Sequence, residues 1–429
     1  MKTFLRTLFF FLLVTQICFS QWFLQNIPGQ SKILKDVHVF DENTAIAVGD
    51  SGTIIKTTDG GTNWTSQTSG TSNEINSVYF VDSYIGWIVG RGSTILKTTN
   101  GGASWTSQAS QNYDPLYSVF FINSSIGWIS GEDNTILKTT NGGTDWTFQQ
   151  DTLPKSVQSI YFIDENNGWA AGIDYNGGSS YTGTILKTTD GGTSWNVQLS
   201  GLSNWLFSIC FANANTGWAV GTGIILNTVD GGANWNSQIS GTTDWLNGVY
   251  FTDPNNGTAV GLSWNGTNYE SIIFRTTNGG TNWTTQTSGT TVALNGVSFI
   301  DANNGTAVGD GGTILKTTNG GATFVDEEVL NEIPTEFLLT QNYPNPFNPS
   351  TKIRYSVPQN SNVIIKVFGI LGNEIETLVN EEKPVGTYEI TWYAANLPSG
   401  IYFYKLQADN PSTSSGQVYV EVKKMVLMK

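Results

Sequence analysis

The chain is poor in cysteine, histidine and charge, and each shortage excludes a class of structure or function. It has two cysteines and one histidine in 429 residues. Cys18 lies in an N-terminal segment that we expect to be removed, so Cys210 would have no disulfide partner. The lone histidine, His38, excludes a histidine-rich metal site, and no acidic spacing matches a calcium loop, so we expect neither a metal nor a cofactor. The net charge of −14 argues against nucleic acid as a partner.

Long apolar runs are scarce as well, and the one worth noting lies at the N-terminus. Lys2 and Arg6 precede the short apolar run LFFFLLV, and small residues ending at Ser20 offer a cleavage site. The run is too short to span a bilayer comfortably. We therefore predict that residues 1–20 form a signal peptide and that no membrane insertion remains after its removal.

Glycine and aromatic residues, in contrast, are abundant. The chain has 48 glycines, and 12% of its residues are aromatic. Glycine is costly inside helices, and helix-favouring runs of alanine, leucine, glutamate and lysine are missing. This composition suits many short strands joined by tight turns, so we expect an all-β fold.

One short motif, KTTDGGTNW at Lys56–Trp64, is written seven times. Its copies end at Trp64, Trp105, Trp146, Trp195, Trp235, Trp283 and Phe324. A recurring interval of about 41 residues indicates a repeat architecture. In the second copy, alternating apolar and β-branched residues predict strands at Ser77–Val81, Gly86–Val89, Thr94–Thr98 and Ser104–Gln108. Four strands per repeat is the size of one blade, so residues 21–324 are predicted to form a seven-bladed β-propeller.

The motif itself resembles the Asp-box of bacterial-neuraminidase-type repeats, Ser/Thr-x-Asp-x-Gly-x-x-Trp. Its acidic or amide position is occupied by Asp59, Asn100, Asn141, Asp190, Asp230, Asn278 and Asn319. Both residue types can close a turn through their side-chain oxygen, whereas a catalytic or metal-binding carboxylate would not be exchanged for an amide. No lysine follows the glycines to hold a phosphate. We expect the motif to be a structural brace between the third and fourth strands, with its tryptophan packed between blades.

The N-terminus contains a partial repeat. QWFLQNIPG, starting at Gln21, resembles the blade-end sequence NWTSQTSGT, and the seventh motif carries Phe324 in place of tryptophan. We predict that the N-terminal strand completes or reinforces the last blade and so fastens the ring.

A different pattern begins after the repeats. Residues 325–337 are acidic, contain a proline and are expected to form a linker. The segment 338–429 closely resembles the C-terminal sorting domain of type IX secretion systems. The matching positions are Asn342, Tyr343, Pro344, Asn345, Pro346, Phe347, Gly400, Lys423 and Lys424. The resemblance implies a small β-sandwich recognised by the type IX secretion machinery, and hence a secreted or outer-surface location; an adhesive or substrate-binding sandwich is the alternative.

The propeller segment also has a family resemblance. The pattern GWxVGxxGTIxKTTDGGxxW, from Leu34 to Phe324, is similar to the repeats of photosystem II stability/assembly-factor propellers and their bacterial relatives. Members in photosynthetic organisms are known for an arginine patch, whereas this propeller has only Arg91 and Arg275. The photosynthetic role is therefore not expected to carry over.

An enzyme is the main competing hypothesis. Sialidase-type chemistry in Asp-box proteins uses three arginines, and two cannot supply them. His38 has no supporting motif for a nucleophile triad, and we expect it on a strand surface. A pair of carboxylates in the loops remains possible, so a glycan-active hydrolase or lyase stays open as an alternative.

Departures from the repeat point to a candidate binding surface. Two repeats carry insertions between their second and third strands, Ile173–Gly183 and Leu262–Ser271. With two linking loops they would gather aromatic residues on one rim, namely Tyr175, Tyr181, Trp205, Trp245, Trp264 and Tyr269, with Asp174, Asn176, Asn265 and Asn268 among them. Such a rim suits sugar stacking or a protein hot spot. The alternative is that these aromatics pack their own loops.

The sequence therefore predicts a monomeric, exported binding module whose ligand is an extracellular protein or polysaccharide. A second alternative to the enzyme is an assembly or stability factor for a complex outside the cytoplasm.

Overall fold

The computed structural model describes residues 22–25, 27, 29–109, 114–149, 156–175, 181–238, 244–264, 266–321, 334–394, 397–409 and 418–428. The chain forms two compact units, Met1–Thr323 and Phe324–Lys429, and each is described by itself. The predicted signal peptide, most of the predicted linker, Phe324, Asn176 and Asn265 lie outside the described residues. No helix in the described part is long and apolar enough to cross a membrane.

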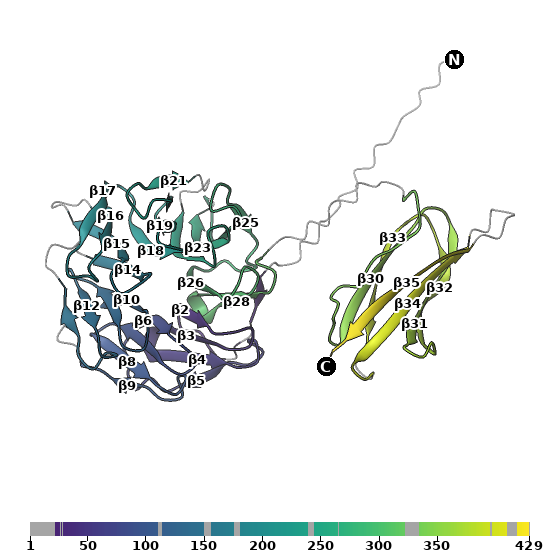
Figure 1. Cartoon of the computed structure of the whole chain (residues 1–429), viewed down its shortest axis with the longest axis horizontal. Helices are drawn as coiled ribbons and strands as arrows, with labels where there is room; N and C mark the ends of the chain where they lie inside the picture. Colours follow the sequence, from purple (N-terminus) through teal and green to yellow (C-terminus); the bar gives the residue numbers. More distant parts are fainter. Residues whose placement is uncertain are drawn as a thin grey trace, which may run out of the picture. The chain divides into compact units, whose positions relative to one another are not determined.

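The first unit is a ring of seven four-stranded antiparallel sheets, the blades (Figure 1). Blade 1 consists of β2 (Leu34–Val39), β3 (Ala45–Gly49), β4 (Thr53–Thr57) and β5 (Thr65–Gln67). Blade 2 consists of β6 (Ile75–Phe80), β7 (Gly86–Gly90), β8 (Thr94–Thr98) and β9 (Thr106–Ser107). Blade 3 consists of β10 (Leu116–Phe121), β11 (Gly127–Gly131), β12 (Ile136–Thr139) and β13 (Thr147–Phe148). Blades 4 and 5 consist of β14 (Ser156–Phe162), β15 (Gly168–Tyr175), β16 (Tyr181–Thr188) and β17 (Asn196–Leu202); and β18 (Leu206–Phe211), β19 (Gly217–Gly221), β20 (Ile224–Thr228) and β21 (Asn236–Gln238). Blades 6 and 7 consist of β22 (Trp245–Phe251), β23 (Gly257–Trp264), β24 (Tyr269–Thr276) and β25 (Thr284–Gln286); and β26 (Leu294–Phe299), β27 (Gly305–Gly309), β28 (Ile314–Thr317) and β1 (Phe23–Leu24). Short 3₁₀ turns occur at Asp50–Gly52 and Asp310–Gly312. The predicted seven-bladed propeller is confirmed.

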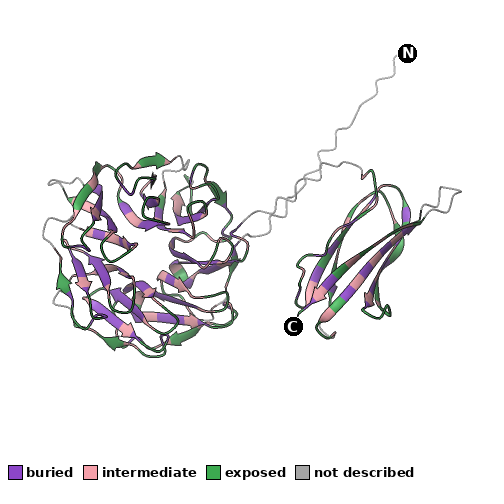
Figure 2. Ribbon diagram, in the orientation of Figure 1, coloured by how far each residue is buried: buried purple, intermediate pink, exposed green. Residues whose placement is uncertain are grey.

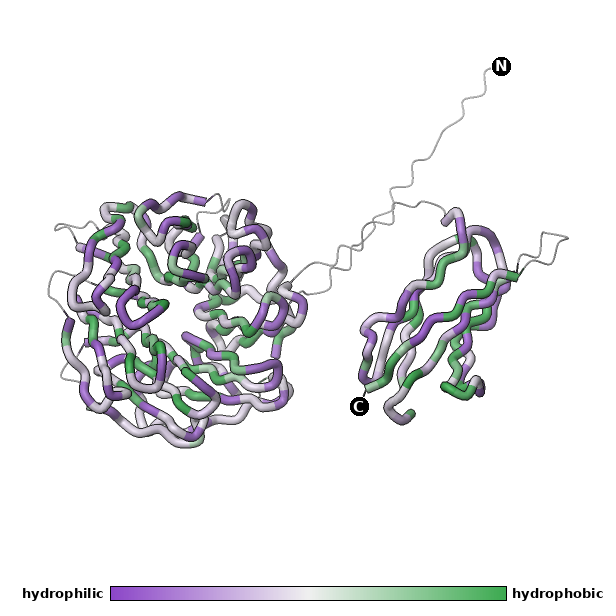
Figure 3. Tube along the Cα trace, in the orientation of Figure 1, coloured by the Kyte–Doolittle hydropathy of each residue, from purple (hydrophilic) through white to green (hydrophobic). Residues whose placement is uncertain are grey.

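The core lies between blades, because each sheet buries both faces against its neighbours. The second strands, such as Gly86–Gly90, are buried along their whole length, whereas outer strands such as Thr106–Ser107 are exposed (Figure 2). Apolar residues accordingly follow the inner strands and hydrophilic residues the turns (Figure 3). One hydrophobic cluster combines Ile46 and Ile54 of blade 1 with Ile75 and Phe80 of blade 2. Burial on both faces explains why these strands are continuous apolar runs rather than strict alternations.

Two aromatic contacts recur around the ring. The second-strand tryptophan of one blade stacks on the first-strand phenylalanine of the next, as Trp87 does on Phe121 at 3.5 Å between ring centroids. The same pairing joins Trp128 to Phe162, Trp169 to Phe211 and Trp218 to Phe251. The Asp-box tryptophan then meets that phenylalanine edge-on, as Trp146 meets Phe121 at 5.9 Å. Aromatic pairs of this geometry contribute about 0.5–1.5 kcal/mol beyond their buried area, so the repeat supplies the same fastening at blade after blade.

The Asp-box is a hydrogen-bonded turn, as the sequence predicts. The Thr57 hydroxyl accepts the buried N–H of Gly61 at 2.9 Å, and the Asp59 carboxylate accepts the N–H of Asn63 at 2.9 Å. Gly60 and Gly61 have φ of 71° and 89°, where a side chain would be strained. The amide copies make the same bond, for example from the N–H of Ser104 to Asn100 Oδ1. Asp and Asn are therefore interchangeable here, because the turn needs a side-chain oxygen that accepts the backbone N–H, whether or not that oxygen is charged.

The N-terminal strand closes the ring, and this prediction is confirmed. β1 pairs antiparallel with β28, with Phe23 opposite Lys316. Trp22 is fully buried and meets Phe299 edge-on at 5.8 Å, the contact that an Asp-box tryptophan makes in the other blades. Its indole N–H donates to Gln286 Oε1 at 2.8 Å. Trp22 thus takes the position that Phe324 would have to fill if the seventh repeat were complete.

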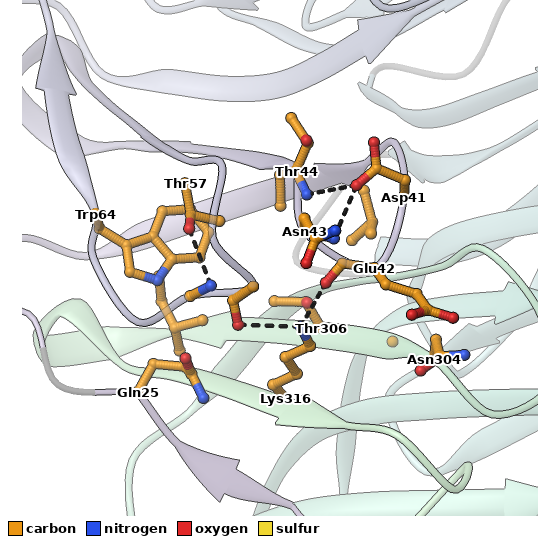
Figure 4. Close-up of a pocket in the computed structure, with 16 residues that line it drawn as sticks. Gln25, Asp41, Glu42, Asn43, Thr44, Thr57, Trp64, Asn304, Thr306 and Lys316 are labelled. Atoms are coloured by element: carbon orange, nitrogen blue, oxygen red, sulfur yellow. Dashed lines mark hydrogen bonds between the residues drawn. The ribbon is translucent and has the colours of Figure 1, made fainter. Parts of the chain in front are cut away.

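The closing junction between blades 7 and 1 contains a narrow pocket (Figure 4). The Lys316 ammonium group donates to the carbonyls of Glu42 and Gly60, at 2.6 and 3.0 Å. Gln25 reaches so close to Gly61 that a Cβ there would meet its Oε1. In blades 1, 2 and 4 a lysine makes the same bond to the next Asp-box, as Lys56 does to Gly101 at 2.7 Å. The junction therefore repeats the standard contact between blades, with residues from both ends of the propeller.

The second unit is a two-sheet sandwich. One sheet contains β29 (Leu338–Leu339), β30 (Ser350–Val357) and β33 (Gly386–Tyr393), and the other β32 (Glu374–Lys383), β31 (Ser361–Gly369), β34 (Gly400–Asp409) and β35 (Val418–Leu427). Their alternating apolar residues share one core that includes Ile353, Val367, Trp392, Tyr404 and Met425. Strands β30, β31, β33 and β34 show the alternating apolar residues that predict a strand. In β32, EIETLVNEEK, half of the residues are charged and only three are apolar, so this pattern does not predict it.

The sorting-motif positions come together at the end of β35. Asn345 Oδ1 accepts the N–H of Val426 at 2.8 Å, and Phe347 is buried and bonds through its N–H to the Val426 carbonyl at 2.9 Å. Asn342 donates to Thr351 Oγ1. Tyr343 is largely exposed. Gly400 lies opposite Leu427, and Lys423 and Lys424 lie in β35 itself. The motif's two halves, eighty residues apart, therefore form one structural unit.

Two expectations need correction. His38 is not a simple surface residue: its ring is half-buried on β2 and packs against Phe40, Tyr79 and Phe80. Burial lowers the pKa of His38 to about 4, so the imidazole is neutral at pH 7. Phe337, which we placed at the end of the linker, stacks on Tyr419 and so belongs with the sandwich.

Candidate ligand-binding surface

The described parts of the two insertions lengthen the second and third strands of blades 4 and 6. Strands β15, β16, β23 and β24 each have eight residues, against four or five in the equivalent strands of the other blades. At the described ends of the hairpins, Tyr175 lies directly opposite Tyr181, and Trp264 lies opposite Tyr269. The ring centroids are 5.2 Å apart in the first pair and 4.7 Å in the second. Cross-strand aromatic pairs stabilise a hairpin, so these residues help to build the extensions that carry them.

Blade 5 lies between the two hairpins and has a shorter turn. Only Thr222 and Gly223 separate β19 from β20, whereas three residues occupy this turn in blades 1 and 2 and four in blade 3. Thr222 connects the segments that carry the two tryptophans: its hydroxyl accepts the N–H of Trp205 at 2.8 Å, and it forms a β-bridge with Trp245. The turn thus fixes both tryptophans relative to each other across two blades.

The predicted aromatic residues form two groups in this region: Tyr181 contacts Tyr175 and Trp205, and Trp264 contacts Tyr269. Trp245, which we expected in a linking loop, is the first residue of β22. The ring centroids of Tyr181 and Trp205 lie 6.0 Å apart, and this contact links the blade 4 hairpin to the loop before blade 5. The backbone N–H of Trp264 donates to Asp244 Oδ1 at 3.1 Å, which links the blade 6 hairpin to the loop before blade 6. We call this set the aromatic surface; it consists of Tyr175, Tyr181, Trp205, Trp245, Trp264 and Tyr269.

These six side chains are partly exposed despite their mutual contacts. Their exposed fractions range from 38% for Trp205 to 59% for Tyr269. The repeat tryptophans of the core, such as Trp87 and Trp128, are completely buried. Loop packing alone therefore accounts for only part of the area of the aromatic surface, and the rest faces solvent.

Basic residues are few in blades 4 to 6: Lys155 directly precedes β14, and Arg275 lies near the far end of β24. Between Ser156 and Phe274 the only basic residue is Lys187. Its ammonium group donates to the Gly231 carbonyl at 2.8 Å, at the Asp-box end of the blades. The carboxylates of Asp174, Asp244 and Glu270 lie in the segments that form the surface. The local charge is therefore neutral to negative.

Blades 1 to 3 carry charged side chains instead of exposed aromatic ones at the same end of the ring. Glu74, in the equivalent position to Trp205, pairs with Lys35 at 3.6 Å and with Arg91 at 3.3 Å. The Tyr117 hydroxyl donates to Glu132 at 2.8 Å, and burial together with that carboxylate raises the pKa of Tyr117. This end of the ring is thus divided into an ionic part on blades 1 to 3 and an aromatic part on blades 4 to 6.

Neither propeller arginine is arranged to grip a substrate carboxylate. Arg275 is buried, donates to Thr258 Oγ1 at 3.1 Å and to the Ala302 carbonyl at 2.7 Å, and lies over the Phe299 ring. Arg91 is paired with Glu74. In the described part of the chain, no three His, Cys, Asp or Glu side chains come close enough to hold a metal ion.

Sequence reasoning missed the residues that organise the surface. Thr222 and Asp244 were not singled out, although they tie the two tryptophans and the second hairpin together. Phe207 was also missed; it lies 6.5 Å from Trp205 on the innermost strand of blade 5. The signal for Thr222 was the single-residue deletion in its turn, which is visible when the repeats are aligned.

Seven antiparallel blades, closed by an N-terminal strand and braced by Asp-box turns, define an Asp-box β-propeller. The chain belongs to the family described as photosynthesis system II assembly factor YCF48, whose model matches residues 14–115, 68–158 and 149–298. A second model, the secretion system C-terminal sorting domain, matches residues 341–421. The sorting domain indicates export to the cell surface or beyond it through the type IX secretion system.

Solved structures with the same fold include distant relatives. A structure of YCF48 bound to D1 peptide is 19% identical, with a TM-score of 0.57, over 70% of this chain and 98% of that one. YCF48 from Cyanidioschyzon merolae is also 19% identical, with a TM-score of 0.56, over 69% and 98%. The GH74 enzyme of Niastella koreensis is 13% identical, with a TM-score of 0.57, over 92% and 67%. No curated protein sequence matches the chain. At these identities the likeness concerns the fold alone.

Proposed function

We propose that this protein is an exported binding module that holds an extracellular ligand on its aromatic surface. The observation that supports this most directly is the exposure of six aromatic side chains on one end of blades 4 to 6, among core tryptophans that are fully buried. Exposed, rigid aromatics with neighbouring hydroxyl and amide groups are typical of binding sites. The sorting domain would deliver this surface to the outside of the cell, where a ligand can reach it.

Two alternatives remain as outcomes of the test. A hydrolase or lyase needs a pair of positioned carboxylates, and its fold-level support is the resemblance to the GH74 enzyme. An assembly or stability factor would bind a polypeptide, as the YCF48 structure with a D1 peptide does. Both alternatives would use the same face for ligand contact, but the aromatic surface needs no catalytic group to act.

A capture experiment tests the proposal. The exported protein is incubated with cell-surface material of the producing organism, beside the double variant Trp205→Ala/Trp245→Ala and the control Tyr84→Ala, an exposed aromatic on the turn between β6 and β7. We expect a ligand that the wild type and the control retain and the double variant loses. Retention by all three proteins would move the site elsewhere. Turnover of the captured material would favour the enzyme.

A further inference from the structure

We infer that the ligand of the aromatic surface is a neutral polysaccharide chain that crosses blade 5 from one hairpin to the other. This inference rests on the proposed function and adds the chemical class of the ligand. Three observations carry it: the scarcity of cations, the repetition of aromatic pairs, and the frame that holds them at fixed positions.

The scarcity of cations and the excess of carboxylates disfavour an anionic ligand. No lysine or arginine occurs between Ser156 and Phe274 except Lys187, whose ammonium group donates to the Gly231 carbonyl; Lys155 directly precedes this span. Carboxylates at Asp174, Asp244 and Glu270 would repel uronic acids, phosphates and sulfates. The chain's net charge of −14 adds to this repulsion at longer range. The charge of this surface therefore favours an uncharged ligand over an anionic one.

The aromatic pairs repeat, which favours a ligand that repeats. Tyr175 with Tyr181 and Trp264 with Tyr269 occupy equivalent positions in hairpins two blades apart. The space between them belongs to blade 5, whose turn is short and whose flanking segments supply Trp205 and Trp245. A chain of similar sugar units offers the same apolar ring face at each step, so it can contact several aromatic groups in succession. A folded protein would need a different side chain to match each of the two aromatic pairs and the tryptophans between them.

The polar groups suit hydroxyl-rich ligands. Asn204 and Thr222 lie beside Trp205 and carry uncharged amide and hydroxyl groups: Asn204 donates to the Thr222 carbonyl, and Thr222 Oγ1 accepts the N–H of Trp205. Protein hot spots, in contrast, combine Trp and Tyr with Arg, which is missing here. Sugar rings bear apolar faces and polar edges, and aromatic faces bordered by amides and hydroxyls match both.

The frame keeps the aromatic groups in place before the ligand arrives. Thr222 bonds to Trp205 and bridges to Trp245, while Asp244 holds the backbone of Trp264. Groups that are already ordered lose little conformational entropy on binding. Binding should consequently depend on the pairs together rather than on any single residue.

Affinity electrophoresis tests the class of ligand. The exported protein is run in gels that contain a soluble neutral polysaccharide (a β-glucan, an arabinoxylan or a mannan) or an acidic one (polygalacturonate or alginate), at low and at high salt. We expect retardation by at least one neutral polysaccharide, unchanged by salt, and none by the acidic ones. Tyr175→Ala/Tyr181→Ala and Trp264→Ala/Tyr269→Ala should each weaken that binding about tenfold or more, equivalent to roughly 1.4 kcal/mol.

The control and the contrary outcomes separate this inference from the proposed function. Tyr84→Ala should bind as the wild type does, and thermal unfolding should show that every variant is folded. Salt-sensitive binding of an acidic polysaccharide would overturn the inference. A protein ligand lost in the same variants would also overturn it, while leaving the aromatic surface as the binding site. Equal binding of a neutral polysaccharide by all variants would contradict both proposals. Binding of no polysaccharide by the wild type would contradict this inference alone.

Discussion

Single residues show how the ring tolerates imperfect repeats. In blades 2 to 5 the second-strand tryptophan stacks on the next blade, but blade 6 has Thr258 at that position. Arg275 compensates: its guanidinium group bonds to Thr258 Oγ1 and covers the Phe299 ring, with Cζ 5.6 Å from the centroid. Counting arginines in the sequence argued against a sialidase triad but did not show that Arg275 is a packing residue. The distinction could not be predicted because it depends on which side chain faces the vacant place.

This compensation predicts a non-additive pair of substitutions. Arg275→Lys alone removes the planar group, and Thr258→Trp alone must displace it, so each should lower stability. The double variant introduces the tryptophan and lysine of blades 2 to 4 and should recover much of the loss, with a coupling energy of about 1–3 kcal/mol. Denaturant unfolding of the four proteins measures it, with Arg91→Lys as an exposed control. Strictly additive losses would contradict the assigned role of Arg275.

His38 predicts a particular dependence of stability on pH. Burial lowers the pKa of His38 to about 4 in the folded protein, whereas an unfolded histidine titrates near 6.5. The unfolded state therefore binds a proton first as pH falls, so stability from this group is complete above about pH 6.5 and is lost progressively toward pH 4. The full effect is at most about 3 kcal/mol.

The substitution His38→Tyr, which copies Tyr79 of the next repeat, should remove this contribution. We expect the difference in unfolding free energy between wild type and variant to change in favour of the variant as pH falls from 7 to 4. Chemical denaturation across that range measures the difference. A constant difference would show that the histidine does not change its protonation between the folded and unfolded states.

At the scale of elements, the sequence predicted the blades well because each repeat contains the apolar strand segments and the Asp, Asn and Gly turn residues of one blade. The second copy was predicted to have strands at Gly86–Val89 and Thr94–Thr98, and the structure has Gly86–Gly90 and Thr94–Thr98. The outer strand was predicted at Ser104–Gln108 and is shorter, Thr106–Ser107, although the N–H of Gln108 still donates to the Ile95 carbonyl at 2.9 Å. The aromatic surface was predicted by residue, but its internal connections through Thr222 and Asp244 were not.

The closing strand yields a prediction with an internal control. Trp22→Ala should cost about 3–5 kcal/mol, the usual range for removing a buried tryptophan, because it empties the core position beside Phe299 and leaves Gln286 without its donor. Phe23→Ala, one residue further along the same strand, should change little since Phe23 is 55% exposed. Thermal unfolding compares them. Similar melting temperatures for both variants would mean that β1 is not a structural part of blade 7.

At the scale of the whole molecule, two units with separate cores share one chain. The propeller core lies between blades, and the sandwich has its own core around Ile353 and Trp392. Two family models match the two units in turn, and both were recognisable from short motifs in the sequence. What the sequence could not supply is the ligand, because binding depends on exposed side chains that the repeat does not constrain.

Separate cores predict separate unfolding. Differential scanning calorimetry of the whole chain should resolve two transitions, and Trp22→Ala should lower only the one that belongs to the propeller. The matched substitution in the other unit, Ile353→Ala, should lower only the second. If both variants shifted the same transition, the units would be energetically coupled.

The closing junction also controls when the propeller can be completed. β1 follows the predicted signal peptide directly, whereas its partner β28 is made almost three hundred residues later. A chain cut short before Ile314 lacks the strand on which Phe23 and Leu24 pair, and it also lacks the sorting domain that follows. Ring closure and export therefore both require the C-terminal part of the chain. Only a chain long enough to close its ring also carries the sorting domain for export.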